Sequence, residues 1–590
     1  MAENMVNVII DGIEVEVPQG STILDAAEAV GVYIPTLCHM NMEKIGMVNK
    51  PASCRVCVVE VEKRRNLAPA CATPVTPGMV VHTNTQKVLE ARRTVMELLL
   101  SDHPKDCLTC EKSGECELQA LAETMGIRKI RITGKSMSTV PVDESSPAIV
   151  RDMTKCIMCR RCETACNQVQ SVGALSAVNR GFPAYVGTSF ETPLNETVCT
   201  FCGQCVQVCP VGALQAKDNT WKVIEAINDP TKTVVVNTAP SVRVALGEEF
   251  GYEPGTSVTG QMVAALRKLG FDYVYDTDFA ADMTIMEEAA ELVDRLTKFL
   301  KGEEVALPLM TSCCPAWVRF IETQYPEFLA LPSSARSPQA MFGAIAKNYL
   351  APKLGIDRKD LVVVSVMPCI AKKYEASRPE LGVEGDPDTN ISITTRELAS
   401  LIKQMNLDLF DMEEEDFDDP LGESTGAGVI FGKTGGVMEA ALRTAYEWIT
   451  GETLENVEFA DVRDAAYGVK VAHLNIAGTD LNIAISSGLA NARAIMEEIK
   501  AGNPNNYHAI EIMACPGGCV DGGGQPYHHG DEEVIFARRQ GLLDEDTDKT
   551  IRKSHENPSI IKIYEEYLEK PNSHLAHQIL HTTYAPKTGV

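Results

Sequence analysis

Cys515 and Cys519 lie four residues apart in the stretch EIMACPGGCVDGGGQP, residues 511–526. Glycines follow both cysteines, so the backbone there can approach a bulky metal cluster very closely. The chain contains twenty cysteines, and in a reducing compartment such a set is more typical of metal ligands than of disulfides. We therefore expect the other cysteines either to complete this cluster or to hold smaller clusters that lead to it.

The first group of cysteines lies in residues 1–81, which we predict to form a plant-type ferredoxin-like domain. Its members are Cys38, Cys54, Cys57 and Cys71. Two close ligands and two distant ones fit a [2Fe–2S] site, with a longer first gap than usual. A structural zinc ion also accepts four thiolates and is the alternative.

A second group occupies residues 82–121 and consists of His103, Cys107, Cys110 and Cys116. Three cysteines at cluster spacing lack a fourth, and His103 supplies the missing ligand of a predicted [4Fe–4S] site. A neutral imidazole in place of a thiolate should raise the reduction potential of that cluster.

Two further runs repeat within residues 140–220, each with the spacing Cys-x2-Cys-x2-Cys-x3-Cys. This is the pattern of a two-cluster ferredoxin, in which the fourth cysteine of each run ligates the other cluster. The predicted ligands are Cys156, Cys159, Cys162 and Cys209 for one [4Fe–4S] cluster, and Cys199, Cys202, Cys205 and Cys166 for the other.

Residues 230–545 change character, because apolar β-branched runs at 233–237, 271–275 and 361–366 precede helical stretches. Such runs predict buried parallel strands of an α/β domain, in which ligands bind at the carboxyl ends of strands. Cys313, Cys314, Cys369 and Cys515 all fall at such ends. The fold class is therefore a multidomain α+β and α/β protein.

Shorter elements complete the prediction. We expect helices over 22–30, capped by Ser21, over 85–101, from Met283 onward and over 560–568. An acidic run at 411–419 is interpreted as a solvated loop, with a docking patch as the alternative. His574, His577 and His581 are assigned to a helix surface and packing, because no acidic or thiol partner accompanies them.

Length and charge limit the function. A chain of 590 residues should contain several domains. The net charge of −27 argues against a nucleic-acid partner and suits basic or metal-bearing protein partners. We find neither a leader-like N-terminus nor an apolar run of membrane-spanning length, so a cytoplasmic protein without a membrane span is expected.

Three motifs together resemble the signatures of the [FeFe] hydrogenase family. They are TSCCPAW at 311–317, MPCIAKKYE at 367–375 and the stretch at 511–526. The N-terminal part resembles the iron–sulfur region of the large complex I subunit, and residues 548–590 resemble the family's small subunit fused as a helical C-terminal region.

The resemblance implies an H-cluster in the domain at 230–545. This is a [4Fe–4S] cube linked to a diiron unit that carries CO, cyanide and a dithiolate with a bridgehead amine. By motif position the cube ligands are Cys314, Cys369, Cys515 and Cys519, with Cys519 as the bridge. Lys372 matches a donor to cyanide. The matching lining residues are Ala239, Pro240, Ser241, Gln339, Met367 and Met513.

The resemblance also implies a proton path. Cys313 matches the thiol beside the bridgehead amine, and the other members are Glu288, Ser333, Glu291 and Arg295. Glu288 and Glu291 are three residues apart and should share one helix face. The alternative for each glutamate is an ordinary surface carboxylate.

The implied function is reversible H2 oxidation and proton reduction, with electrons carried by the N-terminal clusters. Gly432-Lys433-Thr434 resembles the end of a phosphate-binding loop, but Ala427 occupies the position five residues earlier where that loop requires glycine. We therefore assign NAD(P) or flavin chemistry to partner subunits. We expect the catalytic subunit of an NAD(P)-linked or electron-bifurcating complex, with ferredoxin and maturation proteins as further partners. The alternatives are a stand-alone ferredoxin-dependent hydrogenase, a hydrogen or redox sensor, and an assembly or electron-transfer protein without the diiron unit.

Overall fold

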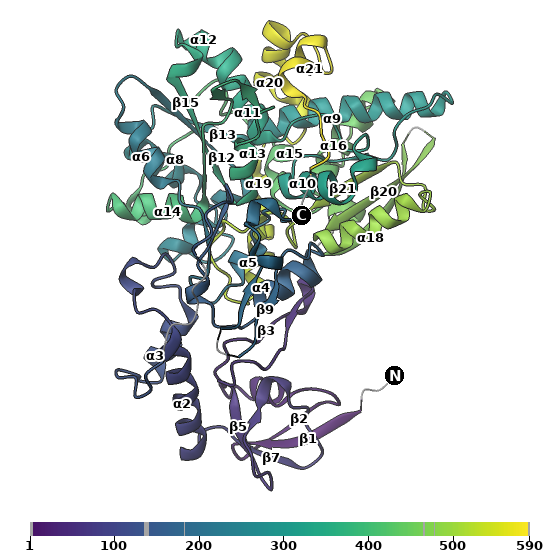
Figure 1. Cartoon of the computed structure of the whole chain (residues 1–590). Helices are drawn as coiled ribbons and strands as arrows, with labels where there is room; N and C mark the ends of the chain where they lie inside the picture. Colours follow the sequence, from purple (N-terminus) through teal and green to yellow (C-terminus); the bar gives the residue numbers. More distant parts are fainter. Residues whose placement is uncertain (1–3, 135–140, 182, 464–466, 477, 588–590) are drawn as a thin grey trace.

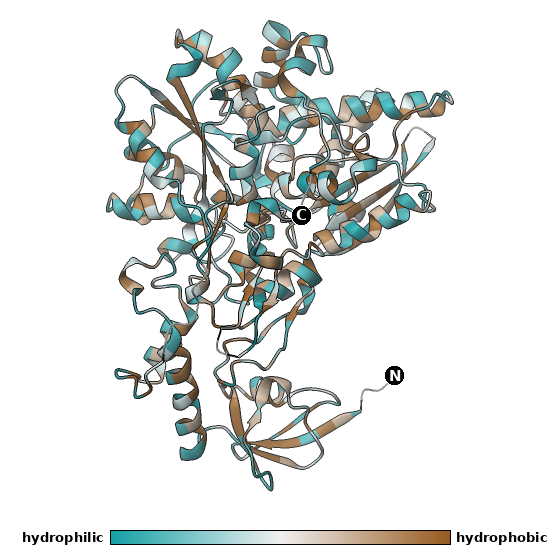
Figure 2. Ribbon diagram, viewed as in Figure 1, coloured by the Kyte–Doolittle hydropathy of each residue, from teal (hydrophilic) through white to brown (hydrophobic). Residues whose placement is uncertain are grey.

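The computed structural model describes residues 4–134, 141–181, 183–463, 467–476 and 478–587. Figure 1 shows the N-terminal domains as a narrow arm below a broad C-terminal body. Figure 2 shows hydrophobic residues concentrated in the strands of that body and hydrophilic residues on the outer helices. In the described part of the chain, no helix has both the length and the apolarity needed to cross a bilayer.

The N-terminal domain is a five-stranded sheet in the order β2-β1-β7-β5-β6. Its elements are β1 Met5–Ile10, β2 Ile13–Pro18, α1 Ile23–Glu28, β5 Val58–Val61, β6 Ala68–Pro69 and β7 Met79–His82. Helix α1 is capped by Thr22, so the expected cap at Ser21 is wrong. Thr22 and Asp25 exchange two hydrogen bonds in a capping box, which Ser21 is placed one residue too early to make.

Two helices flank the second cysteine group. They are α2 Gln86–Asp102, capped by Thr85, and α3 Glu117–Thr124. The ferredoxin-like domain follows with short elements: β8 Ile149–Arg151, α4 Arg161–Thr164, β9 Ser176–Val178, β10 Tyr185–Gly187, α5 Gln204–Gln207 and β11 Leu214–Ala216. Strands β8 and β11 pair antiparallel, as do β9 and β10. Residue 140, where we expected this domain to begin, lies outside the described residues.

The C-terminal body contains two four-stranded sheets. The first has the order β13-β12-β15-β18 and is parallel throughout, with β12 Thr233–Thr238, β13 Tyr273–Asp276, β15 Leu361–Met367 and β18 Ile391–Thr394. The parallel strands predicted at 233–237 and 361–366 are confirmed, and the one predicted at 271–275 begins two residues later.

The second sheet has the order β14-β21-β20-β19. Strands β14 Leu309–Met310, β21 Ala509–Met513 and β20 Thr479–Ser487 are parallel, while β19 Gly468–Ile476 pairs antiparallel with β20. We did not predict the β19–β20 hairpin. Most of β19 alternates between more and less exposed positions, and β20 begins with polar residues and becomes continuously buried only from Ile483 onward, so neither strand is a full-length apolar run like those used to find the others.

Helix α9 Thr277–Leu300 packs against α11 Pro338–Ile345 and α16 Gly436–Thr450. The expected start at Met283 is wrong, because the Asp276 carboxylate accepts a hydrogen bond from the Asp278 N–H and caps the helix six residues earlier. Almost every side chain of α9 up to Ala289 is buried, whereas the second half exposes one side. The helix therefore runs from the interior to the surface.

The remaining helices cover these sheets. They include α6 Thr220–Asn228, α8 Thr259–Leu269, α10 Pro315–Gln324, α13 Ala371–Ala376, α14 Thr395–Gln404, α18 Leu489–Lys500, α19 Glu533–Asp548, α20 Pro558–Ile563 and α21 His574–Leu580. A π-helix at 564–568 extends α20, so the helical stretch predicted at 560–568 is confirmed. The acidic run at 411–419 is only partly a solvated loop, since Glu415 and Asp418 pair with Arg267. His574 and His577 are exposed on α21, as expected. His581 is buried after the helix end and its ring lies 2.9 Å from Glu287 Oε2, so the expectation that no acidic partner accompanies these histidines is wrong for His581.

Candidate active site and metal centres

One cavity lies at the carboxyl ends of β12, β14, β15 and β21. Both sheets point these ends at it, as expected for a ligand site built on parallel strands. The lining residues are Ala239, Pro240, Ser241, Thr277, Cys313, Cys314, Pro315, Pro338, Gln339, Met367, Pro368, Cys369, Lys372, Phe431, Gly432, Met513, Ala514, Cys515, Gly518 and Cys519. The structure thus brings together the four predicted cube ligands, Cys313, Lys372 and all six predicted lining residues.

The chemistry of this cavity fits an iron cluster with small polar ligands. The four predicted cube ligands converge from three different loops, beside Cys313. Most of the remaining wall is apolar, and Ser241, Thr277, Gln339 and Lys372 add polar groups to it. The Ser241 hydroxyl is fully buried and has no hydrogen-bond partner among the residues that the structure describes. Gly518 has φ +104°, and a Cβ there would lie 2.6 Å from the Thr434 nitrogen. Only glycine lets the Cys519 loop pack this closely against its neighbour.

Lys372 is fixed in the cavity wall by Glu375. Its ammonium donates to Glu375 Oε2 at 2.9 Å and to the Cys313 carbonyl at 3.1 Å. Ser337 and Gln339 also donate to Glu375 Oε2. Burial alone would lower the pKa of Lys372, but Glu375 raises it above the usual value, so the buried cation is retained. Glu375 belongs to the motif at 367–375, whose spacing did not indicate this role.

Glu288 lies at the buried end of the predicted proton path. Its Oε1 is 3.5 Å from the Ser312 nitrogen and 3.4 Å from the Ser312 hydroxyl. Burial, with the nearby Glu291 carboxylate, raises the pKa of Glu288 to about 8. Burial and the nearby Glu288 also raise the pKa of the Cys313 thiol. Ser312 was missed because a serine beside a cysteine ligand has no distinguishing spacing.

Glu291 lies one turn further along α9, at the outer end of the path. Its Oε2 accepts from the Ser333 hydroxyl at 2.7 Å, and its Oε1 pairs with Arg295 at 2.5 Å. Arg295 also donates to the Ala306 and Leu331 carbonyls. Glu288 and Glu291 therefore lie along one side of α9, as their spacing predicted. Arg295 joins them from the next turn, and Ser333 from the 331–336 segment.

The four cysteines of the N-terminal domain are buried close together. The Cys57 and Cys71 sulfurs are 3.4 Å apart, and the Cys38 thiol contacts those of Cys54 and Cys71. In the second group, His103 directly follows α2 and Cys116 directly precedes α3. A Cβ on Gly212 would lie 2.6 Å from the Cys110 sulfur, which places this segment beside the Cys209 loop.

The two ferredoxin-type runs cross as predicted. One small cavity is lined by Cys156, Cys159, Cys162 and Cys209, and another by Cys166, Cys199, Cys202 and Cys205. Each run contributes its fourth cysteine to the other cavity.

Asn49 and Arg161 connect the three N-terminal cysteine groups. The buried Asn49 amide donates to the carbonyls of Cys38 and Cys159 at 2.6 and 3.1 Å. Arg161 pairs with Glu117 and donates to the His39 carbonyl. These contacts hold the first and second groups against the Cys156 cavity.

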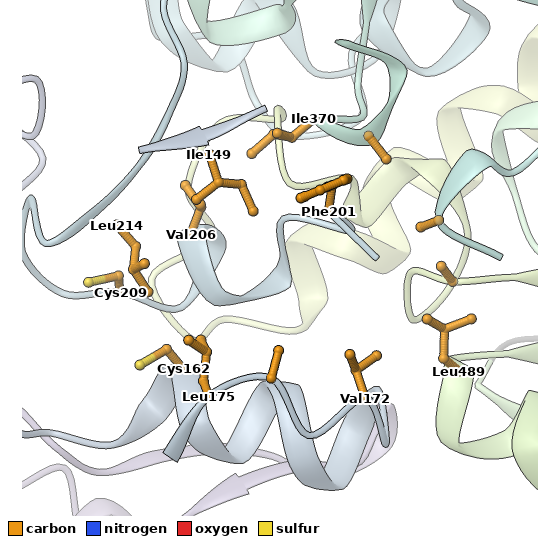
Figure 3. Packing of buried hydrophobic residues seen from close by; sticks show 14 of the residues in the cluster. Ile149, Cys162, Val172, Leu175, Phe201, Val206, Cys209, Leu214, Ile370 and Leu489 are labelled. Carbon is orange, nitrogen blue, oxygen red and sulfur yellow. The ribbon is translucent and has the colours of Figure 1, made fainter. Parts of the chain in front are cut away.

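The Cys199 cavity adjoins the Cys519 loop. A Cβ on Gly523 would lie 2.7 Å from the Gly203 Cα, so two backbones touch there. Gln170 and Gln204 donate to the carbonyls of Ala514 and Asp521, both at 2.8 Å. Figure 3 shows Phe201 and Val206 of the ferredoxin-like domain in one hydrophobic cluster with Ile370, which follows Cys369. The last small site thus lies directly against the large cavity.

Family models match successive parts of the chain. The C-terminal domain of the iron-only hydrogenase large subunit matches residues 232–523, and the iron hydrogenase small subunit matches 532–587, beginning within the stretch we assigned to the catalytic domain. A 2Fe-2S iron-sulfur cluster binding domain matches 3–86. The NADH-ubiquinone oxidoreductase-G iron-sulfur binding region matches 92–131, and the ferredoxin-like domain of NADH-quinone oxidoreductase subunit 3 matches 146–215.

Individual proteins resemble the chain over nearly its whole length. The NADP-reducing hydrogenase subunit HndD of Solidesulfovibrio fructosivorans is 61% identical, over 98% of this chain and 99% of that protein. Iron hydrogenase 1 of Clostridium pasteurianum is 39% identical, over 98% and 100%. The solved structure of a variant of apo [FeFe]-hydrogenase HydA1 from Chlamydomonas reinhardtii is 41% identical, with a TM-score of 0.55, covering 62% of this chain and 99% of that one.

Proposed function

The chain belongs to the [FeFe] hydrogenase family, and from this premise we propose that it is the hydrogen-converting subunit of a complex that exchanges electrons with NAD(P) through partner subunits. It is a hydrogenase with iron–sulfur domains at its N-terminus. The proposed electron exchange with NAD(P) rests on the 61% identity to an NADP-reducing hydrogenase subunit over nearly the full length. That similarity favours the complex over a stand-alone ferredoxin-dependent enzyme and over a sensor.

The cavity residues have separate tasks toward the H-cluster. Cys314, Cys369, Cys515 and Cys519 would hold its cube, and Ser241 and Lys372 would donate to its polar ligands. When bound, the group supplies the cleavage and formation of dihydrogen. Met367, Met513 and the prolines of the wall exclude water, and this keeps a single route open for protons.

Protons travel along α9. The Cys313 thiol gives or takes the proton at the cavity wall, and Glu288, protonated at neutral pH, carries it inward or outward. Ser312 lies beside Glu288, and Ser333 hands the proton to Glu291. Arg295 holds the Glu291 carboxylate at the outer end. The four carriers, Cys313, Glu288, Ser333 and Glu291, each have a thiol, carboxyl or hydroxyl group that can donate a proton and accept another.

Electrons travel on the other side, through one [2Fe–2S] and three [4Fe–4S] clusters held by the N-terminal cysteines and His103. The Cys199 cavity lies against the Cys519 loop, where the backbones of Gly203 and Gly523 touch. The chain's own phosphate-loop-like segment cannot serve NAD(P), because Lys433 is fully buried and donates to the Thr434 and Arg463 carbonyls. NAD(P) and flavin therefore bind to partner subunits, with ferredoxin as a further electron partner. Maturation proteins install the diiron unit, and the reduced thiols suit a cytoplasmic location.

An infrared spectrum of anaerobically matured protein tests the site. Iron-bound CO and cyanide stretches that shift under H2 are expected, and their absence in protein with full iron–sulfur content would refute the H-cluster. The NAD(P) link needs its own experiment. The isolated subunit should reduce a viologen with H2 but not NADP+, and adding the flavin-containing partner should restore NADP+ reduction. Direct NADP+ reduction by the subunit alone would contradict this division of labour.

A further inference from the structure

The C-terminal strap, residues 581–587, crosses the segment 331–336 that carries Ser333. The Arg336 nitrogen donates to the Leu580 carbonyl and the Thr582 nitrogen donates to the Ser334 carbonyl, both at 2.8 Å, and Ala335 forms an isolated bridge with His581. Further along, the Lys587 nitrogen donates to the Glu322 carbonyl at 2.9 Å. The strap therefore runs beside the proton-path segment in the manner of a short strand.

His581 joins the strap to α9. Its ring nitrogens lie 2.8 Å from the Ser334 hydroxyl and 2.9 Å from Glu287 Oε2, and its carbonyl accepts from the Arg336 guanidinium at 3.0 Å. Glu287 is fully buried and directly precedes Glu288. Two neighbouring carboxylates of α9 therefore have different tasks. Glu287 anchors the strap, and Glu288 belongs to the proposed proton path.

Tyr584 reaches the path itself. Its hydroxyl donates to the Ser333 carbonyl at 2.7 Å. Tyr584 also lies near enough to Ser312, Glu288 and Glu291 for all three to influence the pKa of its phenol. Burial raises the pKa of the Tyr584 phenol above its usual value, so this group remains a donor. Tyr584 therefore lies between the inner group, Glu288 with Ser312, and the outer group, Ser333 with Glu291.

We propose that Tyr584 and His581 are positioning residues of the proton path, and that the strap holds Ser333 in place and covers the path against bulk water. The inference rests on the proposed hydrogenase function and assigns a task to the small-subunit-like region. Without the Tyr584 hydroxyl, the Ser333 carbonyl would lose its partner and the segment would shift or admit water. Ser333 would then meet Glu291 less often in the geometry that proton transfer needs.

The experiment compares matured Tyr584→Phe with Tyr567→Phe, a tail tyrosine whose ring packs on Tyr349 away from the path. We expect Tyr584→Phe to lose about tenfold in turnover with excess electron mediator, the cost of one well-placed hydrogen bond. Its solvent hydrogen/deuterium isotope effect should rise, because proton transfer becomes limiting. Amide exchange should speed up in peptides covering 331–336, while the CO and cyanide bands stay unchanged. Tyr567→Phe should match the wild type in all four readouts.

Two outcomes overturn the positioning role. In both, Tyr584→Phe keeps the wild-type turnover and isotope effect. If amide exchange at 331–336 is also unchanged, Tyr584 does not hold the segment. If amide exchange there is faster, the strap serves stability alone. If Tyr584→Phe does not accumulate, His581→Gln tests the same strap and should raise the isotope effect in the same direction. Absence of CO and cyanide bands in matured wild-type protein would instead refute the proposed function, and the inference with it.

Discussion

Glu288 should be protonated at neutral pH. Its pKa of about 8 arises from burial and from the neighbouring Glu291 carboxylate. At pH 7 about nine in ten Glu288 side chains should therefore carry a proton, and half should do so near pH 8. The informative change is Glu288→Gln, because an amide keeps the shape and neutrality of the protonated acid but cannot pass a proton on.

Infrared difference spectra between wild-type protein and Glu288→Gln measure this state directly. The carbonyl stretch of a buried carboxylic acid should be present at pH 6 and fade with a midpoint near pH 8. Turnover in the variant should fall by about 10² to 10⁴, the range for a positioned acid–base group. Absence of the stretch at pH 6, or wild-type turnover in the variant, would refute the assignment.

The same pKa gives a sign for stability. The folded-state pKa of Glu288 lies above its unfolded value, so the native protein binds this proton more tightly. The contribution is fully present below about pH 4.5 and is lost as pH rises through 8, amounting to at most about 5 kcal/mol. The variant's thermal inactivation midpoint should therefore rise relative to wild type between pH 5 and 9. Parallel pH curves for the two proteins would contradict this.

Three further changes test other parts of the site. Cys313→Ala should keep the H-cluster infrared bands and lose most turnover, and wild-type turnover there would eliminate the thiol as a relay. Gly523→Ala places a methyl group 2.7 Å from the Gly203 Cα, so we expect about 1–3 kcal/mol of destabilisation and slower ferredoxin-driven turnover at unchanged iron content. Glu375→Gln leaves Lys372 buried without its carboxylate, at a cost of about 3–5 kcal/mol. It should lower the thermal midpoint and shift the cyanide stretches, and unshifted stretches would show that Lys372 does not depend on Glu375.

The grouping of the cysteines could be predicted from the sequence because cluster ligands are spaced locally. The two ferredoxin-type runs fix which four thiols meet, and the structure brings each set together around its own cavity. Parallel strands were also predictable, since β12 and β15 are buried on both faces and therefore read as continuous apolar runs. The large cavity followed from these strands, because Cys314, Cys369 and Cys515 each follow the end of a strand, while Cys519 lies further along the same loop as Cys515.

Contacts between distant segments could not be predicted in this way. Ser312 and Glu288 are 24 residues apart, and Tyr584 and Ser333 are 251 apart. Neither pair has a spacing pattern, because hydrogen bonds to a carbonyl or a hydroxyl impose no particular residue type along the chain. The start of α9 was misplaced for a related reason, since its cap at Asp276 belongs to the end of β13 and interrupts no apolar pattern.

In the proposed function, electron transfer and proton transfer place different demands on the protein. The fold meets these demands on different sides of one cavity. Electron transfer needs close approach, and the chain achieves it with glycine backbones in contact at Gly203 and Gly523. Proton transfer needs exchangeable groups shielded from water, and α9 provides these as it runs from the buried Glu288 to the surface near Arg295. Where α9 leaves the core, its side faces solvent unless another segment covers it. The strap at 581–587 contacts the segment beside this region, where Tyr584 donates to the Ser333 carbonyl. The small-subunit-like region thus has a physical reason to remain part of the catalytic body.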